Sequence, residues 1–200
     1  MSGRSRLGMT LVEVAISASL LGLVIATIFG MYLLGLKLWS GNDSRSQLLS
    51  SLHLSSRQLG RSVSESTSDG ASLNATPDIL SLLSPRDDDG NSELSLNGLR
   101  RWLSWEVYYR EETVLKMSRI PWTGSAAERE VPTPLETATG LTLIGAATGG
   151  RTVSRHLYAV EYTIQPDGEL LTVDWEFRLP SKGKPNGERL QTQNVFRFRN

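Results

Sequence analysis

The chain has no cysteine among its 200 residues, and it has only two histidines. Without cysteine, neither a disulfide nor a thiolate nucleophile or metal ligand can form. His53 and His156 lie far apart in the sequence and have no clustered partners, which favours surface positions over a metal or general-base role. No nucleophile elbow, phosphate-binding loop or dinucleotide fingerprint occurs either. The sequence therefore predicts a protein that is not an enzyme and has no resident cofactor.

The chain also lacks an excess of charge of either sign, because its 21 basic residues balance its 21 acidic ones. Without a basic surplus there is no electrostatic case for binding nucleic acid. The charges are unevenly distributed, and no charged residue occurs from Val14 to Leu36. A helix over this stretch would be about 35 Å long, slightly more than the ~30 Å hydrocarbon core of a bilayer. The sequence thus predicts one membrane-spanning helix near the N-terminus.

The residues that flank this stretch predict its orientation. Lys37 and Trp39 supply a snorkelling cation and an interfacial aromatic ring at the far end. Arg4 and Arg6 flank the near end, which the positive-inside rule places in the cytoplasm. A cleavable secretory signal would have a shorter apolar region followed by a small residue, whereas here the small residue, Gly8, comes first. We therefore expect a cytoplasmic N-terminus and an extracytoplasmic C-terminal domain.

A single carboxylate, Glu13, lies in the first turn of the apolar stretch, within the run Gly8-Met9-Thr10-Leu11-Val12-Glu13-Val14. An ionisable group inside a membrane helix is costly and points to a function. The alternative is that Glu13 merely lies near the helix N-terminus, where the helix dipole favours an anion. That alternative leaves Gly8 and the basic leader unexplained.

This run closely resembles the N-terminal signal of type IV pilins and of the pseudopilins of type II secretion. The resemblance implies that a prepilin peptidase cuts after Gly8 and methylates the new N-terminal Met9, where the family usually has phenylalanine. It also implies that Thr10 and Glu13 belong to the assembly signal. The α-amine that the cut would create lies about 6 Å from Glu13 along a helix axis. When helices stack with a stagger, Glu13 of one subunit can meet the amine of its neighbour, so that two buried charges satisfy each other.

The sequence after Trp39 predicts a soluble continuation of the same helix. Residues 10–63 are expected to form one helix, whose second half has an apolar stripe and a polar face of Ser, Arg and Gln. The stripe consists of Leu48, Leu49, Leu52, Leu59 and Val63. Residues 64–77, rich in Ser, Thr, Asp and Gly, read as a linker or surface loop. The predicted division is a leader at 1–8, a transmembrane segment at 9–39, a soluble helix at 40–64 and a globular domain at 65–200.

The globular domain reads as antiparallel strands joined by turns. Alternating patterns predict one hairpin over 103–109 and 113–120, and a second over 157–164 and 170–179 with a Pro-Asp-Gly turn between its strands. Asn186-Gly187 predicts a turn before a last strand over 190–198, and residues 123–139, with two prolines, predict a long loop. A helix followed by antiparallel strands predicts an α+β fold, with the long N-terminal helix packed on an antiparallel sheet.

The hairpins and the C-terminal Phe196-Arg197-Phe198-Arg199-Asn200 resemble J-type minor pseudopilins and W-type minor pilins. This implies a subunit at or near a filament tip, with a prepilin peptidase, other pilin-like subunits, an inner-membrane assembly platform and the lipid bilayer as partners. It also implies the bacterial inner membrane, and then the filament, as its location. A secretion pseudopilus and an adhesion or competence pilus both remain open. The alternative class is a signal-anchored single-pass protein with an extracytoplasmic binding or sensor domain.

One acidic segment is rich in the oxygen ligands that Ca²⁺ prefers: Asp87, Asp88, Asp89 and Glu93. Its spacing departs from that of an EF-hand loop, since Pro85 and Leu96 occupy ligand positions. A solvated Asp-Gly turn between strands is the preferred interpretation, with calcium as the alternative.

Overall fold

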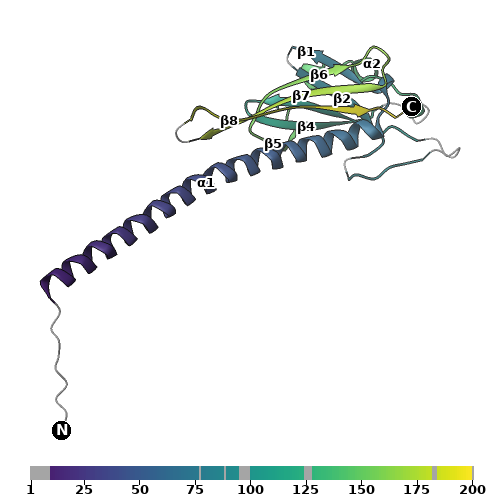
Figure 1. Ribbon diagram of the computed structural model, residues 1–200. Coiled ribbons are helices and arrows are strands. Elements are labelled where there is room, and N and C mark those ends of the chain that lie inside the picture. Colours follow the sequence, from purple (N-terminus) through teal and green to yellow (C-terminus); the bar gives the residue numbers. More distant parts are fainter. Residues whose placement is uncertain are drawn as a thin grey trace, which may run out of the picture. The chain divides into compact units, whose positions relative to one another are not determined.

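The computed structural model describes residues 10–76, 78–87, 89–94, 100–123, 128–181 and 184–199 (Figure 1). The chain divides into two compact units, Met1–Asp43 and Ser44–Asn200. The predicted leader, Gly8 and Met9 lie outside the described residues. The helix α1 (Leu11–Glu65) contributes to both units. The prediction of one helix over 10–63 is confirmed within two residues at each end.

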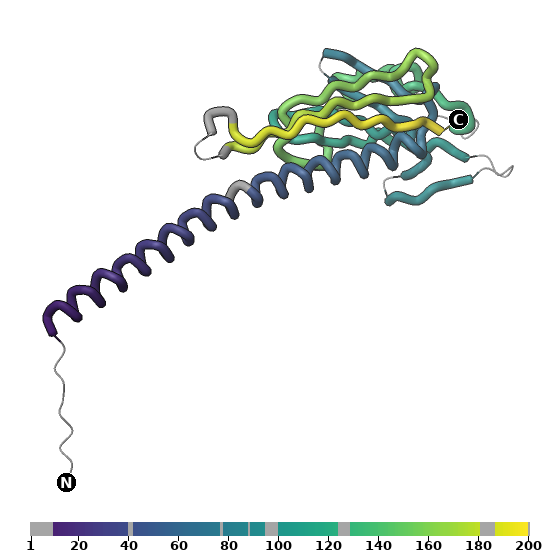
Figure 2. The backbone as a smooth tube through the Cα atoms, in the orientation of Figure 1, coloured from purple at the N-terminus to yellow at the C-terminus, as the bar shows by residue number. Residues whose placement is uncertain are grey.

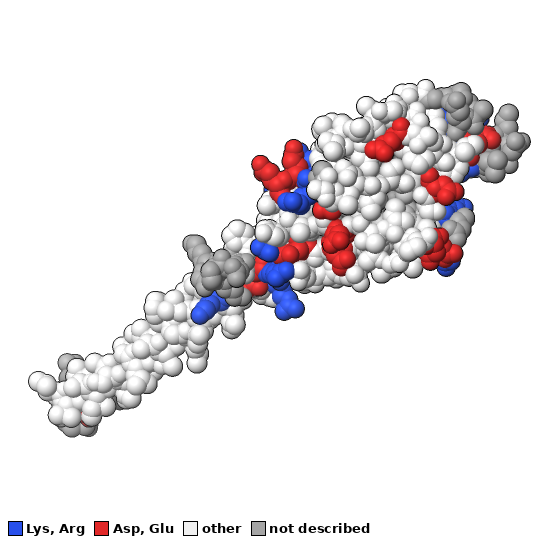
Figure 3. All heavy atoms as spheres, turned by 90° about the horizontal axis from the view of Figure 1, so that it is seen from above, with Lys and Arg blue, Asp and Glu red and all other residues white. Residues whose placement is uncertain are grey.

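In the first unit, α1 exposes its apolar side chains on every side. Eighteen of its large apolar residues are at least 49% exposed, from Leu11 at 86% to Trp39 at 77%. Serine and threonine do not interrupt the helix, because Ser19 and Thr27 each donate to the carbonyl oxygen four residues earlier. The surface of this part is almost entirely free of charged side chains (Figure 3). Among the described residues it is the one segment long and apolar enough to cross a membrane, with a mean hydropathy of 2.2.

The second unit contains two antiparallel sheets, and its fold is α+β as predicted. The five-stranded sheet has its strands in sequence order: β1 (Ser72–Ala75), β2 (Asp78–Ser84), β3 (Ser104–Glu111), β4 (Val114–Pro121) and β5 (Arg151–Arg155). The three-stranded sheet has the order β6 (Leu157–Ile164), β7 (Leu170–Ser181), β8 (Lys184–Arg197). Both predicted hairpins are confirmed, as the β3–β4 and β6–β7 pairs.

Two hydrophobic cores cover both faces of the five-stranded sheet. The larger core joins Leu59 and Val63 of α1 to β2, to Tyr108 of β3 and to the inner face of the three-stranded sheet, where Trp175 is 2% exposed. The smaller core lies on the opposite face, where Trp105 stacks on Trp122 with ring centroids 4.5 Å apart. Because both faces are buried, β2 and β3 show continuous burial along most of their length.

The second half of α1 packs against the sheets, and Figure 2 shows it running alongside them. Leu48, Leu59 and Val63 are buried as predicted, but the placement of Leu49 in the stripe is wrong, since that side chain is 47% exposed. The prediction of serines on the solvent face is wrong for three of them, because Ser51, Ser55 and Ser62 are buried. Their small size lets the helix approach the strands closely, and the Ser55 and Ser154 hydroxyl oxygens are 2.5 Å apart.

Two segments predicted as loops contain regular structure. The predicted linker at 64–77 holds the 3₁₀ turn η1 (Ser68–Gly70) and the edge strand β1. β1 is the edge strand of its sheet and pairs with β2, and its side chains are half-buried except that of Ala75. The described part of 123–139 holds η2 (Glu128–Glu130) and α2 (Leu135–Thr139), and α3 (Leu143–Ala146) follows. Helices this short show no periodicity, although Leu135 is fully buried.

The predicted turn at Asn186-Gly187 is wrong, because both residues lie within β8. The pairing of β7 with β8 shifts register between Leu179 and Ser181, so β8 accommodates extra residues opposite Pro180. Gly187 has a φ of 66°, and a Cβ there would lie 2.3 Å from the Leu179 carbonyl oxygen. The positive φ that glycine tolerates at position 187 therefore belongs to a β-bulge and not to a turn.

Candidate functional site

The first candidate site is the N-terminus of α1, where Thr10 and Glu13 bind each other reciprocally. The Thr10 backbone N–H and hydroxyl donate to Glu13 Oε2 at 2.9 and 3.1 Å. The Glu13 N–H donates to the Thr10 hydroxyl at 3.3 Å. This is a capping box, which satisfies two backbone donors that a helix N-terminus leaves without partners. The Thr-x-x-Glu spacing of this box is visible in the sequence.

The acidic segment forms a turn closed by its own side chains. The Asp87 carboxylate accepts from the Asn91 backbone N–H at 2.7 Å and from the Asn91 amide at 3.4 Å, while Gly90 adopts a φ of 85°. The backbone hydrogen bond from Asn91 lowers the pKa of Asp87. Glu93 lies 3.8 Å from Arg101, and Asp88 lies outside the described residues. Within the described part of the chain no three His, Asp or Glu residues are arranged to hold a metal, and calcium binding stays the untested alternative to a solvated turn.

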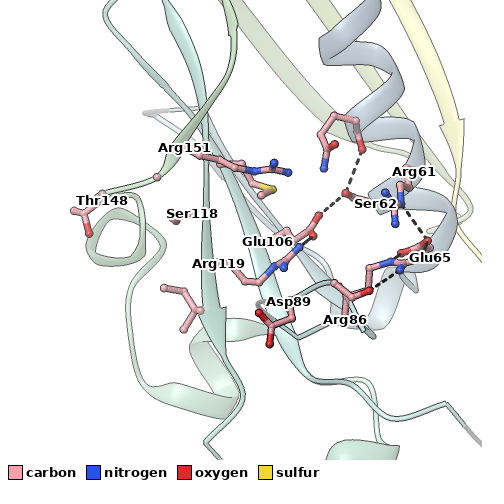
Figure 4. Close-up of a pocket in the computed structure, with 16 residues that line it drawn as sticks. Arg61, Ser62, Glu65, Arg86, Asp89, Glu106, Ser118, Arg119, Thr148 and Arg151 are labelled. Carbon is pink, nitrogen blue, oxygen red and sulfur yellow. Dashed lines mark hydrogen bonds and ion pairs between the residues drawn. The ribbon is translucent and has the colours of Figure 1, made fainter. Parts of the chain in front are cut away.

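A polar cleft of about 580 Å³ lies in the second unit between α1, β4 and the segment that leads into β5 (Figure 4). Its size is within the range of ligand sites, about 300–1,000 Å³. Four arginines and three carboxylates line it: Arg61, Arg86, Arg119, Arg151, Glu65, Asp89 and Glu106. Sequence reasoning missed this cleft, because its residues come from segments far apart in the sequence and belong to no motif.

At the base of the cleft, Glu106 of β3 is buried and fully engaged. The Ser62 hydroxyl donates to its Oε2, and the Tyr108 hydroxyl donates to the same oxygen at 3.2 Å. Arg119 donates to Oε1 at 2.5 Å. Burial, and secondarily the charge of Glu106, raises the pKa of Tyr108 above its ordinary value, so this phenol stays a neutral donor. The cluster joins α1 to the sheet with its buried charges paired.

At the side of the cleft, Glu65 at the end of α1 forms a bidentate pair with Arg86. Arg86 Nε and Nη2 each donate to one oxygen of Glu65 at 2.7 Å. The hydrogen bonds from Arg86 lower the pKa of Glu65 and raise that of Arg86. Both side chains are less than a third exposed, so solvent screens this pair only partly.

Comparison with protein-family models, with curated proteins and with solved structures found no match to this chain.

Proposed function

We propose that this protein is a minor pseudopilin or minor pilin. It is inserted in the bacterial inner membrane with its leader in the cytoplasm, cut after Gly8 by a prepilin peptidase, and methylated at Met9. It then assembles through its helix at or near the tip of a type II secretion pseudopilus or a type IV pilus. Its role is structural, and its partners are pilin-like subunits and the assembly platform.

One observation carries this proposal: the order of a short basic leader, Gly8, the Thr10–Glu13 signal and a long uncharged helix. A bare membrane anchor has no need of Gly8 or of a carboxylate in its first turn. Further support comes from the apolar side chains that α1 exposes in the first unit of the chain. This surface is suited to lipid and to neighbouring helices.

Mass spectrometry of the N-terminus tests the proposal. The full chain is expressed in bacteria with and without an active prepilin peptidase, extracted from membranes and analysed intact. We expect a chain that begins at N-methylated Met9 only where the peptidase is active, with Gly8→Val remaining uncut. Retention of the leader beside an active peptidase would refute the filament function.

The second candidate is a signal-anchored protein with an extracytoplasmic binding domain. Two observations favour it: the capping box gives Glu13 a structural role within its own chain, and the second unit has a cleft of ligand-binding size. The same measurement separates the two, because an anchor keeps Met1 and its leader.

A further inference from the structure

The polar cleft has donors that its own carboxylates leave unused. Both oxygens of Glu65 accept from Arg86, and both oxygens of Glu106 accept from Arg119, Ser62 or Tyr108. These two carboxylates are therefore occupied and poorly placed to receive a cation or a basic ligand.

Three arginines retain binding capacity. Arg119 Nε is buried and has no hydrogen-bond partner among the described residues. Arg151, at the start of β5, is exposed, and its side chain has neither an ion pair nor a hydrogen bond in the described part of the chain. Arg61 is 55% exposed, and its one ion-pair contact, to Glu65, is long at 3.5 Å. A buried N–H without a partner is costly, and an oxygen ligand would satisfy it.

Arg61, Arg119 and Arg151 line the same cleft. Figure 4 shows Arg151 extending from its strand toward α1, above Arg119 and Glu106, while the Asp89 carboxylate points away from Arg151. Among the described residues that line the cleft, every cationic side chain is an arginine. Guanidinium groups present a planar fork of donors that matches carboxylate and phosphate oxygens.

We infer that this cleft is a binding site for an oxyanion, a carboxylate or a phosphate group, held by Arg151 and Arg61 above the Nε of Arg119. Such binding is independent of membrane insertion and of filament assembly. The carboxylate could belong to an acidic segment of another protein, and the phosphate to a small molecule.

Titration calorimetry on the full chain in detergent micelles tests the inference, with two probes: an acetylated and amidated triglutamate peptide, and inorganic phosphate. We expect saturable binding of at least one probe, weakened roughly tenfold or more in Arg151→Gln. The matched control is Arg155→Gln, which removes an exposed arginine from the same strand but outside the cleft, and which should bind like the unmodified chain.

Tighter binding of the peptide identifies a protein carboxylate as the ligand, and tighter binding of phosphate identifies a small anion. The inference is overturned if neither probe binds, if Arg151→Gln binds normally, or if Arg155→Gln weakens binding equally. Circular dichroism checks that the variants fold. If Arg151→Gln does not fold, Arg61→Gln takes its place in the same comparison.

Discussion

At the scale of single residues, Glu13 has two sets of partners. Within its own chain it closes a capping box with Thr10, and in the proposed filament it would meet the α-amine of a neighbouring subunit. One role can follow the other in time, because the capping box can hold the carboxylate until a neighbouring subunit binds. The capping role needs both Thr10 and Glu13, whereas the proposed filament contact needs only the Glu13 carboxylate. Substitutions at the two positions therefore separate the two roles.

We expect Glu13→Ala to be inserted and cut but to fail to join its filament, because it loses the charge that pairs with the neighbouring amine. Thr10→Val is the matched comparison: it removes the capping hydroxyl, at a cost of about 1 kcal/mol of helix stability, and keeps the carboxylate. Co-purification of each variant with sheared filaments measures assembly. If both variants co-purify with filaments to the same extent, Glu13 acts only as a capping residue.

Glu65 makes stability depend on pH in a defined direction. Its pKa is lower in the folded chain than its ordinary value of 4.5, first because of the hydrogen bonds from Arg86. The unfolded state therefore takes up the proton more readily. The stabilisation is complete above pH 4.5 and is lost as the pH falls through the folded-state pKa.

Urea unfolding in micelles, followed by tryptophan fluorescence, measures this effect. We expect Glu65→Gln to lower the free energy of unfolding by about 1–3 kcal/mol at pH 7. The difference in free energy of unfolding between this variant and the unmodified chain should become smaller as the pH is lowered past 4.5. Arg86→Gln should remove the same pH-dependent part. A difference in free energy of unfolding that stays constant with pH would show that the ion pair contributes nothing to stability.

At the scale of elements, the helix and the two hairpins could be predicted because each has a local periodicity. The face of α1 could not be predicted in full. Ser55 and Ser62 are polar by sequence, but Ser154 and Glu106 lie opposite them and make their burial favourable. Similarly, Asn186-Gly187 has the composition of a turn, but the pairing with β7 places it in a bulge.

The packing of the second half of α1 is tested by two identical substitutions. Leu59 is fully buried and Leu54 is 54% exposed, although both lie on the same helix. We expect Leu59→Ala to lower the free energy of unfolding of the second unit by about 2–5 kcal/mol and Leu54→Ala by less than about 1 kcal/mol. Equal losses in urea unfolding would mean that the helix does not dock through this face.

At the scale of the whole molecule, the two units differ in what keeps them folded. The first unit, Met1–Asp43, has no buried side chain among its described residues, whereas the second has two cores. We expect a fragment of residues 44–200 to stay soluble without detergent and to unfold cooperatively, because both cores lie entirely within it. The full chain should instead partition into the detergent phase. Aggregation of the fragment would show that the first unit is needed for folding.

The sequence by itself determined the apolar segment, the Thr10–Glu13 run at its start, the helix and the β3–β4 and β6–β7 hairpins. These features depend on composition, on repeats of two or 3.6 residues and on turns between neighbouring residues. Tertiary structure alone decided that serines line the core side of α1, that Glu106 is buried, and that arginines from α1, β4 and β5 face one cleft. Burial of a polar group depends on partners supplied by distant segments, and no local pattern records those partners.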